Sequence, residues 1–197
     1  MRIAGRAIRL KQADDINTDY IISGRYKFAI SDPKELAKHI FEDIDADFAK
    51  NLKPGDILVA GRNFGMGSSR EQAPVSLKAA GIKAVVAVSF ARIFYRNSFN
   101  IGLPLVECDT KNLQAGDELE IDFDKAVLFN KTKQQKINII KLPQMLLNFL
   151  KFGGAVEYLK ESVFAREPAT VSMAGDRSKL RTKEIASSSR LRRDSSQ

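Results

Sequence analysis

Apolar residues in the middle of the chain gather in short runs that are separated by polar, helix-like segments. Ile57–Ala60 and Ala84–Val88 are apolar throughout and Leu103–Val106 is a third such run, a pattern typical of strands buried on both faces. Between these runs the spacing predicts helices at Glu71–Ala80 and Phe90–Asn97. The order strand, helix, strand, helix, strand indicates a three-layer α/β core with parallel strand pairing.

Weaker patterns flank this core on both sides. Ala7–Lys11 alternates apolar and basic residues and predicts a strand, while apolar residues at helical spacing predict a helix from Pro33 to Asp45 or beyond. Alternation farther along predicts a β-meander with three strands. These strands are Leu119–Phe123, Ala126–Phe129 and Lys136–Ile140. A closing helix is expected at Pro143–Phe152, stopped by two glycines.

The chain changes character after residue 164. Residues 166–197 contain eight basic and four acidic residues, so they hold +4 of the net charge of +8. They contain no aromatic residue and few large apolar ones, so a packed core cannot form there. We therefore expect a domain over 1–164 and a basic, Ser/Arg-rich, disordered tail over 165–197. Because the tail carries half of the excess charge, the folded part gives little support to a nucleic-acid-binding role.

Composition limits the chemistry that this chain can supply alone. Apolar residues make up 44% and charged residues 28%, as in globular proteins. The single cysteine, Cys108, and the single histidine, His39, exclude an internal disulfide and any zinc or iron–sulfur site built from this chain alone. Neither a signal peptide nor an apolar run of membrane-spanning length is found, so we expect a reducing cytoplasm and no membrane contact.

The loop Gly61–Ser69 carries the candidate chemistry. Three glycines, among them Gly67, allow the backbone to approach a ligand closely. The loop leads into a helix, whose N-terminus presents free N–H groups and a partial positive charge, which favours an anion such as a carboxylate. Ser68 and Ser69 add two hydroxyl groups, and Arg70 adds a planar cation that suits a carboxylate.

Other interpretations of this loop are less consistent with its residues. It lacks the Gly-Lys-Ser/Thr ending of a phosphate-binding P-loop. It has no neighbouring histidine, so a nucleophile elbow is not indicated either. A capped helix after a tight turn remains the purely structural alternative.

Three segments in order closely resemble the signature of the swivel domain of aconitase relatives. In chain order, Asp15–Asp19 resembles the family's first active-site loop, Gly61–Ala73 its glycine-loop signature, and Ser89–Asn97 with Asn100–Pro104 its second helix and following strand. The resemblance covers roughly residues 1–160. It implies a swivelling β/β/α domain with a short parallel core and a β-meander. It also implies a hydro-lyase that removes and re-adds water on a hydroxy acid.

The resemblance also implies roles and a partner. Ser68 corresponds to the serine that acts as base, Ser69 would contribute an amide or hydroxyl, and Arg70 would bind a substrate carboxylate beside Gly67. Thr18 and Asp19 fall where relatives place residues that line the site, with a structural role as the alternative. Because the domain stands on a short chain, it is most similar to the two-chain isopropylmalate isomerases and homoaconitases. A large subunit with a [4Fe–4S] cluster is then expected, in a heterodimer or heterotetramer.

The substrate prediction depends on the loop around Phe28. Tricarboxylate-using relatives place an arginine at the position aligned with Phe28, whose ring instead suits a branched alkyl group. This favours 3-isopropylmalate over homocitrate or citrate. Lys27 or Arg25 would meet a third carboxylate if the loop were displaced by one residue, and 2,3-dimethylmalate also fits an apolar ring. A non-catalytic anion-binding module is the alternative from another functional class.

Overall fold

The computed structural model describes residues 1–11, 13–26, 29–68 and 70–164. Three predicted site residues, Lys27, Phe28 and Ser69, and the predicted tail at 165–197 lie outside the described residues. Met1–Ser162 forms one compact unit. The expected domain boundary at residue 164 and the disorder of the tail stay predictions.

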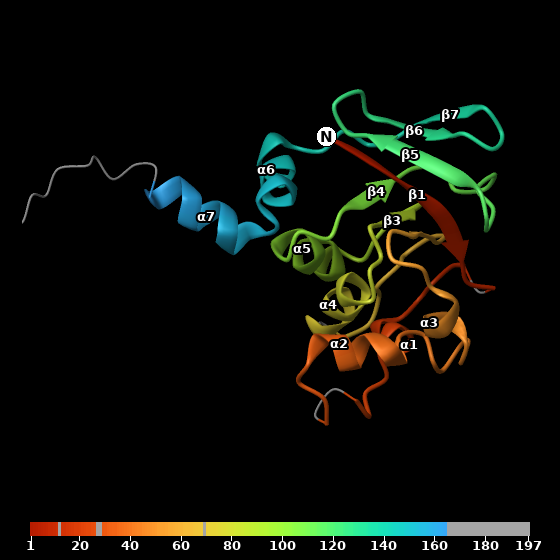
Figure 1. Cartoon of the computed structure of the whole chain (residues 1–197), viewed down its shortest axis with the longest axis vertical. Coiled ribbons are helices and arrows are strands. Elements are labelled where there is room, and N and C mark those ends of the chain that lie inside the picture. Colours follow the sequence, from red (N-terminus) through yellow and green to blue (C-terminus); the bar gives the residue numbers. More distant parts are fainter. Residues whose placement is uncertain (12, 27–28, 69, 165–197) are drawn as a thin grey trace, which may run out of the picture. The chain divides into compact units, whose positions relative to one another are not determined.

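Seven strands form the sheet in the order β4-β3-β2-β1-β5-β6-β7 (Figure 1). Their bounds are Arg2–Arg9 for β1, Ile57–Val59 for β2, Ala84–Ala87 for β3, Leu105–Glu107 for β4, Glu118–Asp122 for β5, Val127–Asn130 for β6 and Gln135–Asn138 for β7. β1 pairs in parallel with β2, Ala7 opposite Ile57, and antiparallel with β5, Ile3 opposite Ile121. The predicted parallel core and β-meander are thus confirmed, and β1 belongs to both.

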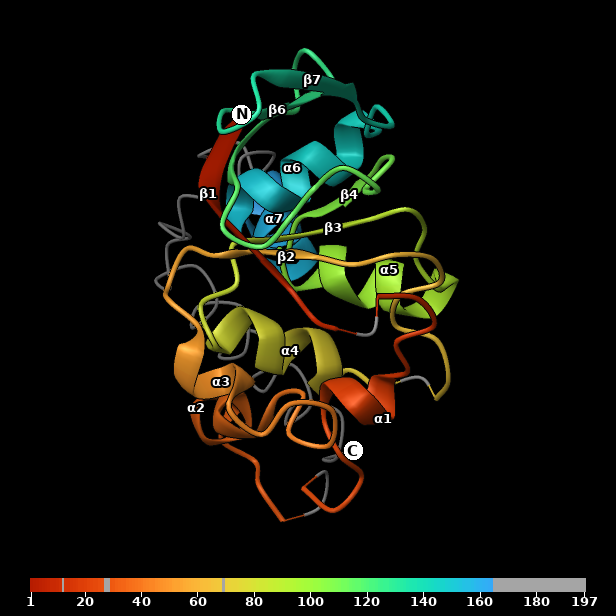
Figure 2. The ribbon, with the colours of Figure 1, turned by 90° about the vertical axis from the view of Figure 1, so that its right-hand side faces the viewer.

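The helices connect and flank these strands. Their bounds are Thr18–Ile21 for α1, Pro33–Leu36 for α2, Phe48–Asn51 for α3, Gln72–Ala79 for α4, Arg92–Asn100 for α5, Gln144–Phe152 for α6 and Ala155–Phe164 for α7. Helices α1 to α5 lie on one side of the parallel strands, away from the meander (Figures 1 and 2). No helix among the described residues combines the length and apolar composition that crossing a bilayer requires.

The parallel strands form the centre of the hydrophobic core. Every residue of β2 and β3 is buried, as their unbroken apolar sequences predict. Leu77 of α4 and Phe99 of α5 pack into the same cluster from the helical side. This rigid layer supports the loops that leave the carboxyl ends of the strands, and the candidate site is built from those loops.

The long helix predicted from Pro33 to Asp45 is wrong. Helix α2 ends at Leu36, a 3-10 turn covers Ala37–His39, and Phe41 has a positive φ of 57°. The Phe41 N–H donates to the carbonyl of Ile21 at 3.0 Å, so a contact with a distant segment replaces the helical hydrogen bond. The closing helix, by contrast, is confirmed: α6 ends at Phe152 and Gly153 is its C-cap. A separate helix, α7, follows it.

A buried ion pair connects β1 with the turn before β2. Arg6 donates to both carboxylate oxygens of Asp56, at 3.0 and 2.7 Å, and the Lys53 N–H donates to one of them at 2.9 Å. Burial alone would raise the pKa of Asp56, but the hydrogen bonds from Arg6 and Lys53 outweigh it and the pKa lies below its ordinary value. The Asp56 side chain is only 4% exposed, so water does not compensate for a lost partner there. Neutralising Asp56 would leave the Arg6 guanidinium without the carboxylate that pairs with it.

We therefore expect Asp56→Asn to lower the free energy of unfolding by roughly 1–3 kcal/mol at pH 7, a range discounted for the partly exposed Arg6. Folding lowers the pKa of Asp56, so its contribution is complete above the ordinary value of 3.8 and is lost as the pH falls below it. Urea unfolding of both proteins from pH 7 to pH 2.5 measures this, and the difference should shrink in acid. Asp122→Asn, which removes the more exposed pair with Arg2, is the control and should cost less.

Candidate active site

The loops that follow β1, β2 and β3 lie side by side at the carboxyl edge of the parallel strands (Figure 2). The Gly65 N–H donates to the carbonyl of Ile16 at 2.8 Å, which connects the glycine loop with the first loop. The Phe64 N–H donates to the carbonyl of Ser89 at 3.0 Å, which connects it with the third. The three segments singled out in the sequence therefore meet at one place.

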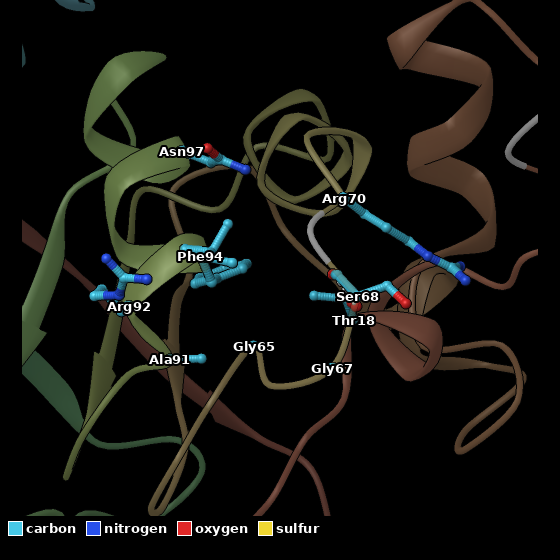
Figure 3. Close-up of a pocket in the computed structure, with 10 residues that line it drawn as sticks. Thr18, Gly65, Gly67, Ser68, Arg70, Ala91, Arg92, Phe94 and Asn97 are labelled. Atoms are coloured by element: carbon cyan, nitrogen blue, oxygen red, sulfur yellow. Dashed lines mark hydrogen bonds between the residues drawn. The ribbon is translucent and has the colours of Figure 1, made fainter.

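A pocket of about 180 Å³ opens between these loops and α5 (Figure 3). Four predicted site residues line it: Thr18, Gly67, Ser68 and Arg70. The opposite wall comes from the start of α5, with Ala91, Arg92, Ile93, Phe94 and Asn97. The pocket is smaller than the roughly 300–1,000 Å³ that is usual for a complete small-molecule site, as expected of part of a site.

Thr18 holds the backbone of the glycine loop. Its side-chain hydroxyl donates to the Ser68 carbonyl at 2.9 Å, and its N–H donates to the Met66 carbonyl at 2.8 Å. Asn17 caps α1 by accepting the Asp19 N–H at 3.0 Å, which fixes the direction of this segment. Thr18 is 2% exposed, so its geometry fits the structural role while it still borders the pocket.

Two glycines of the loop have positive φ and no room for a side chain. A Cβ on Gly65, at φ 79°, would lie 2.2 Å from Cγ of Phe94. A Cβ on Gly67, at φ 91°, would lie 2.3 Å from Oδ1 of Asn17. The glycines therefore allow the loop to pack against both neighbours while it presents Ser68.

Ser68 and Arg70 lie in different surroundings on either side of the loop's end. Ser68 is exposed to solvent, whereas the Arg70 side chain is 12% exposed and forms an ion pair with Asp19. Nη1 of Arg70 donates to the Ile22 carbonyl at 3.4 Å, and its Nε is buried without a hydrogen-bond partner among the described residues. Figure 3 shows the guanidinium pointing away from α5. An unpartnered buried donor is rare in proteins, and its partner is commonly an ordered water or a ligand.

The segment just before the undescribed Lys27 and Phe28 is firmly anchored. Tyr26 stacks on His39 with ring centroids 3.9 Å apart, and both side chains contact the same Glu42 oxygen at 2.8 Å. The hydrogen bond from Tyr26, followed by that from His39, lowers the pKa of Glu42. The roles predicted for Lys27, Phe28 and Ser69 stay predictions.

The ligands for an iron–sulfur cluster are not assembled in the described part of the chain. No group of three His, Cys, Asp or Glu side chains is placed there to hold a metal ion. Burial, followed by the nearby Asp109, raises the pKa of the Cys108 thiol to about 12, so it stays protonated and is a poor cluster ligand. The described residues therefore do not fit a cluster.

The wall formed by α5 was not predicted as part of the site. The segment Ser89–Pro104 was recognised by its resemblance, but no residue in it was assigned to the pocket. The signal was nevertheless available, because the carboxyl ends of adjacent parallel strands share one edge of a sheet. Ala91 follows β3 as Gly61 follows β2, so both loops had to face the same space.

Comparison with known proteins identifies the family. Residues 9–110 match the aconitase C-terminal domain. A 3-isopropylmalate dehydratase small subunit 2 from Archaeoglobus fulgidus is 52% identical over 161 residues, which cover 82% of this chain and 96% of the relative. This chain belongs to the aconitase C-terminal domain family. The family predicted from the three motifs is thereby confirmed.

Further relatives support the same assignment of this aconitase-family chain. The 3-isopropylmalate dehydratase small subunit of Caldicellulosiruptor saccharolyticus is 52% identical over 152 residues, covering 76% of this chain and 87% of that one. The crystal structure of 3-isopropylmalate dehydratase from Methanocaldococcus jannaschii has 45% identity and a TM-score of 0.79, with 84% of this chain and 97% of that chain covered. This chain thus shares its fold with the Methanocaldococcus jannaschii protein and is similar in sequence to both relatives.

The close contact between Gly67 and Asn17 gives a stability prediction. Gly67→Ala should lower the free energy of unfolding by about 1 kcal/mol more than Gly116→Ala, because the new methyl group displaces the Asn17 cap as well as straining the backbone. Gly116 is the matched control, since its φ is 92° and a Cβ there meets nothing within 4 Å. Chemical denaturation of the two variants measures the difference. Equal losses would show that Asn17 moves away freely.

Proposed function

We propose that this chain is the small subunit of a 3-isopropylmalate dehydratase, which interconverts 2- and 3-isopropylmalate by removing and re-adding water. Relatives with this name match most of the chain at about half identity. The observation in the structure that supports the proposal most is the pocket that both Ser68 and Arg70 line, with the Arg70 Nε unpartnered among the described residues.

Ser68 is proposed as the base of the reaction. Dehydration removes a proton from the carbon next to a carboxylate and the hydroxyl group from its neighbour. A serine hydroxyl near its free pKa is a weak base, so the alkoxide must be stabilised by N–H donors and cations in a site without bulk water. The start of α4 contributes a partial positive charge four residues after Ser68. Thr18 fixes the Ser68 backbone through the carbonyl.

Arg70 is proposed to bind a substrate carboxylate. Its ion pair with Asp19 and its contact with the Ile22 carbonyl hold the guanidinium in one orientation, which lowers the entropy lost on binding. Nε is proposed to donate to the substrate, since no group in the described part of the chain accepts its proton. Asp19 acts in this proposal as a positioning residue for Arg70 rather than as a direct ligand.

The chain supplies only part of the enzyme in this proposal. A large subunit is proposed to carry the [4Fe–4S] cluster, because the described residues offer no ligand set for it. When bound there, the cluster would supply the Lewis acid that acts on the substrate hydroxyl. The cytoplasm is proposed as the compartment, since a chain with one unpaired cysteine suits reducing conditions.

The pocket wall opposite Ser68 offers contacts to an alkyl group. Ala91, Ile93 and Phe94 contribute apolar surface there, against which a branched alkyl group would gain buried contacts. Arg92 and Asn97 line the same wall and offer polar groups to a carboxylate. The preference for isopropylmalate over homocitrate, with dimethylmalate as the second candidate, therefore rests on Phe28.

The substrate is tested by co-purifying the chain with its large subunit and reconstituting the cluster. We expect turnover of 3-isopropylmalate at a kcat/KM at least tenfold above that of 2,3-dimethylmalate, and far above that of homocitrate. One methylene group in an apolar pocket discriminates by roughly tenfold or more. Turnover of homocitrate alone would overturn the assignment made from Phe28.

The role of Ser68 is tested by Ser68→Ala in the same complex. We expect kcat to fall by roughly 10²–10⁴-fold, the usual contribution of a positioned general base, while the large subunit still binds. Ser162→Ala, on α7, is the control and should keep full activity. Unchanged turnover in Ser68→Ala would remove this residue from the mechanism and favour a non-catalytic anion-binding module.

A further inference from the structure

Residues 21–26, at the end of α1 and just after it, lie against the guanidinium of Arg70, and we call them the backing segment. Nη1 of Arg70 donates to the Ile22 carbonyl at 3.4 Å. A Cβ built on Gly24 would lie 3.6 Å from both Nη1 and Nη2, so the Gly24 backbone borders the same group at van der Waals distance. The position of the guanidinium therefore depends on how firmly the backing segment is held.

One end of the backing segment is held by the backbone of Phe41. Its N–H donates to the Ile21 carbonyl at 3.0 Å, and its φ of 57° is unusual for a bulky residue. Such a conformation costs free energy and persists only where the surroundings enforce it, which occurs mostly at functional sites. Phe41 is fully buried and packs edge-on against Phe48, with ring centroids 4.8 Å apart. This packing keeps the Phe41 N–H directed at the backing segment.

The other end of the backing segment is held by the side chain of Tyr26. Its hydroxyl donates to Oε2 of Glu42 at 2.8 Å, and its ring stacks on His39 with ring centroids 3.9 Å apart. Nδ1 of His39 lies 2.8 Å from the same Glu42 oxygen. The neighbouring Arg25 forms an ion pair with Asp43 at 2.6 Å. We call Tyr26, His39 and Glu42 the anchor cluster, which attaches this end to the same stretch of chain as Phe41.

The anchor cluster differs from an ordinary surface ion pair. All three side chains are partly buried, and two hydrogen-bonding groups meet one carboxylate oxygen while their rings stack. An isolated exposed pair contributes little, whereas several contacts on one group hold it in a single place. None of the three residues lines the pocket beside Ser68, so they do not touch a substrate there. Any effect on the reaction has to pass through the backing segment.

We propose that Tyr26, His39 and Glu42 are positioning residues for Arg70: they fix the backing segment, which fixes the guanidinium for a substrate carboxylate. This rests on the proposed function, because it takes Arg70 as the group that binds the carboxylate. An arginine that is already held loses less side-chain entropy on binding, so the anchor cluster raises affinity without contacting the substrate. The carboxylate is bound in the ground state and the transition state alike, so the effect belongs to KM rather than kcat.

The test measures the kinetics of the reconstituted complex with its large subunit on 3-isopropylmalate. Tyr26→Phe removes one hydrogen bond and keeps the stacked ring, while Glu42→Gln removes the charge that Tyr26 and His39 share. Each should raise KM by about fivefold, because part of the contribution of a hydrogen bond to a charged group reaches Arg70, and kcat should stay within twofold. Unchanged KM in both variants, or a fall in kcat alone, would overturn the proposal.

Tyr158→Phe and Glu35→Gln are the matched controls. Tyr158 packs its ring against Phe149 and Phe152, and Glu35 forms an ion pair with Lys38. Among the described residues, neither side chain has a hydrogen bond or ion pair with the backing segment. Their KM should stay within twofold of the original, and a rise equal to that in the anchor-cluster variants would count against a specific role.

A double-mutant cycle shows whether the anchor cluster acts through Arg70. Arg70→Lys keeps the positive charge but removes the planar group that Ile22 and Gly24 border. In this background Tyr26→Phe should raise KM by less than twofold, because the group that it positions is gone. A rise of about fivefold that persists in the Arg70→Lys background would mean that Tyr26 acts through another group, and the proposal would be wrong.

Nitrogen-15 relaxation of the Arg70 Nε–H in the full chain gives a measurement that needs no activity. The order parameter of this bond, assigned by its loss in Arg70→Lys, should be about 0.8 in the original chain and below about 0.6 in Tyr26→Phe. If the order falls but the original complex does not convert isopropylmalate, the substrate is wrong and the positioning of Arg70 stands. If the complex converts isopropylmalate and Tyr26→Phe changes neither the order nor KM, the positioning is wrong and the proposed function stands.

Discussion

The backbone hydrogen bonds that join the loops after β1, β2 and β3 are the constraint on which the candidate site depends. The parallel strands end at one edge, and the contacts of Gly65 with Ile16 and of Phe64 with Ser89 continue the pairing beyond the strands. Residues separated by some fifty positions in sequence, such as Thr18 and Ser68, are thereby held within hydrogen-bonding distance. A loop without this pairing could not hold a serine in a fixed position.

Close packing beneath the loops makes this arrangement specific. Phe64 is fully buried and meets Phe94 edge-on, with ring centroids 5.2 Å apart. Gly65 then passes over the same ring, where any larger residue would collide with it. The rings of Phe64 and Phe94 thus support the loop from below, and Gly65 allows the loop backbone to pack directly against the Phe94 ring. Apolar packing and polar chemistry are separated by a single residue along the chain.

Much of this architecture is predictable from the sequence because it depends on local patterns. The apolar runs of β2 and β3 mark strands that are buried on both faces, and α4 and α5 begin within two residues of their predicted starts. The predicted continuation of α2 is wrong because Phe41 bonds to Ile21 instead, a choice that no local pattern contains. Thr18, Ser68 and Arg70 lie within recognisable motifs, so they can be predicted as candidate site residues from the sequence. Asn97 and Ile93 enter the pocket only through the packing of α5, which periodicity cannot reveal.

The position of β1 has a consequence for how this protein is made. β1 pairs with β2 about fifty residues later and with β5 more than a hundred residues later. During synthesis one backbone edge of β1 therefore stays unpaired until β2 has left the ribosome, and the other until β5 has. Contacts of such long range slow folding, because the loops must close before any pairing stabilises them. Nascent chains of this protein should accordingly depend on chaperones until the meander is complete.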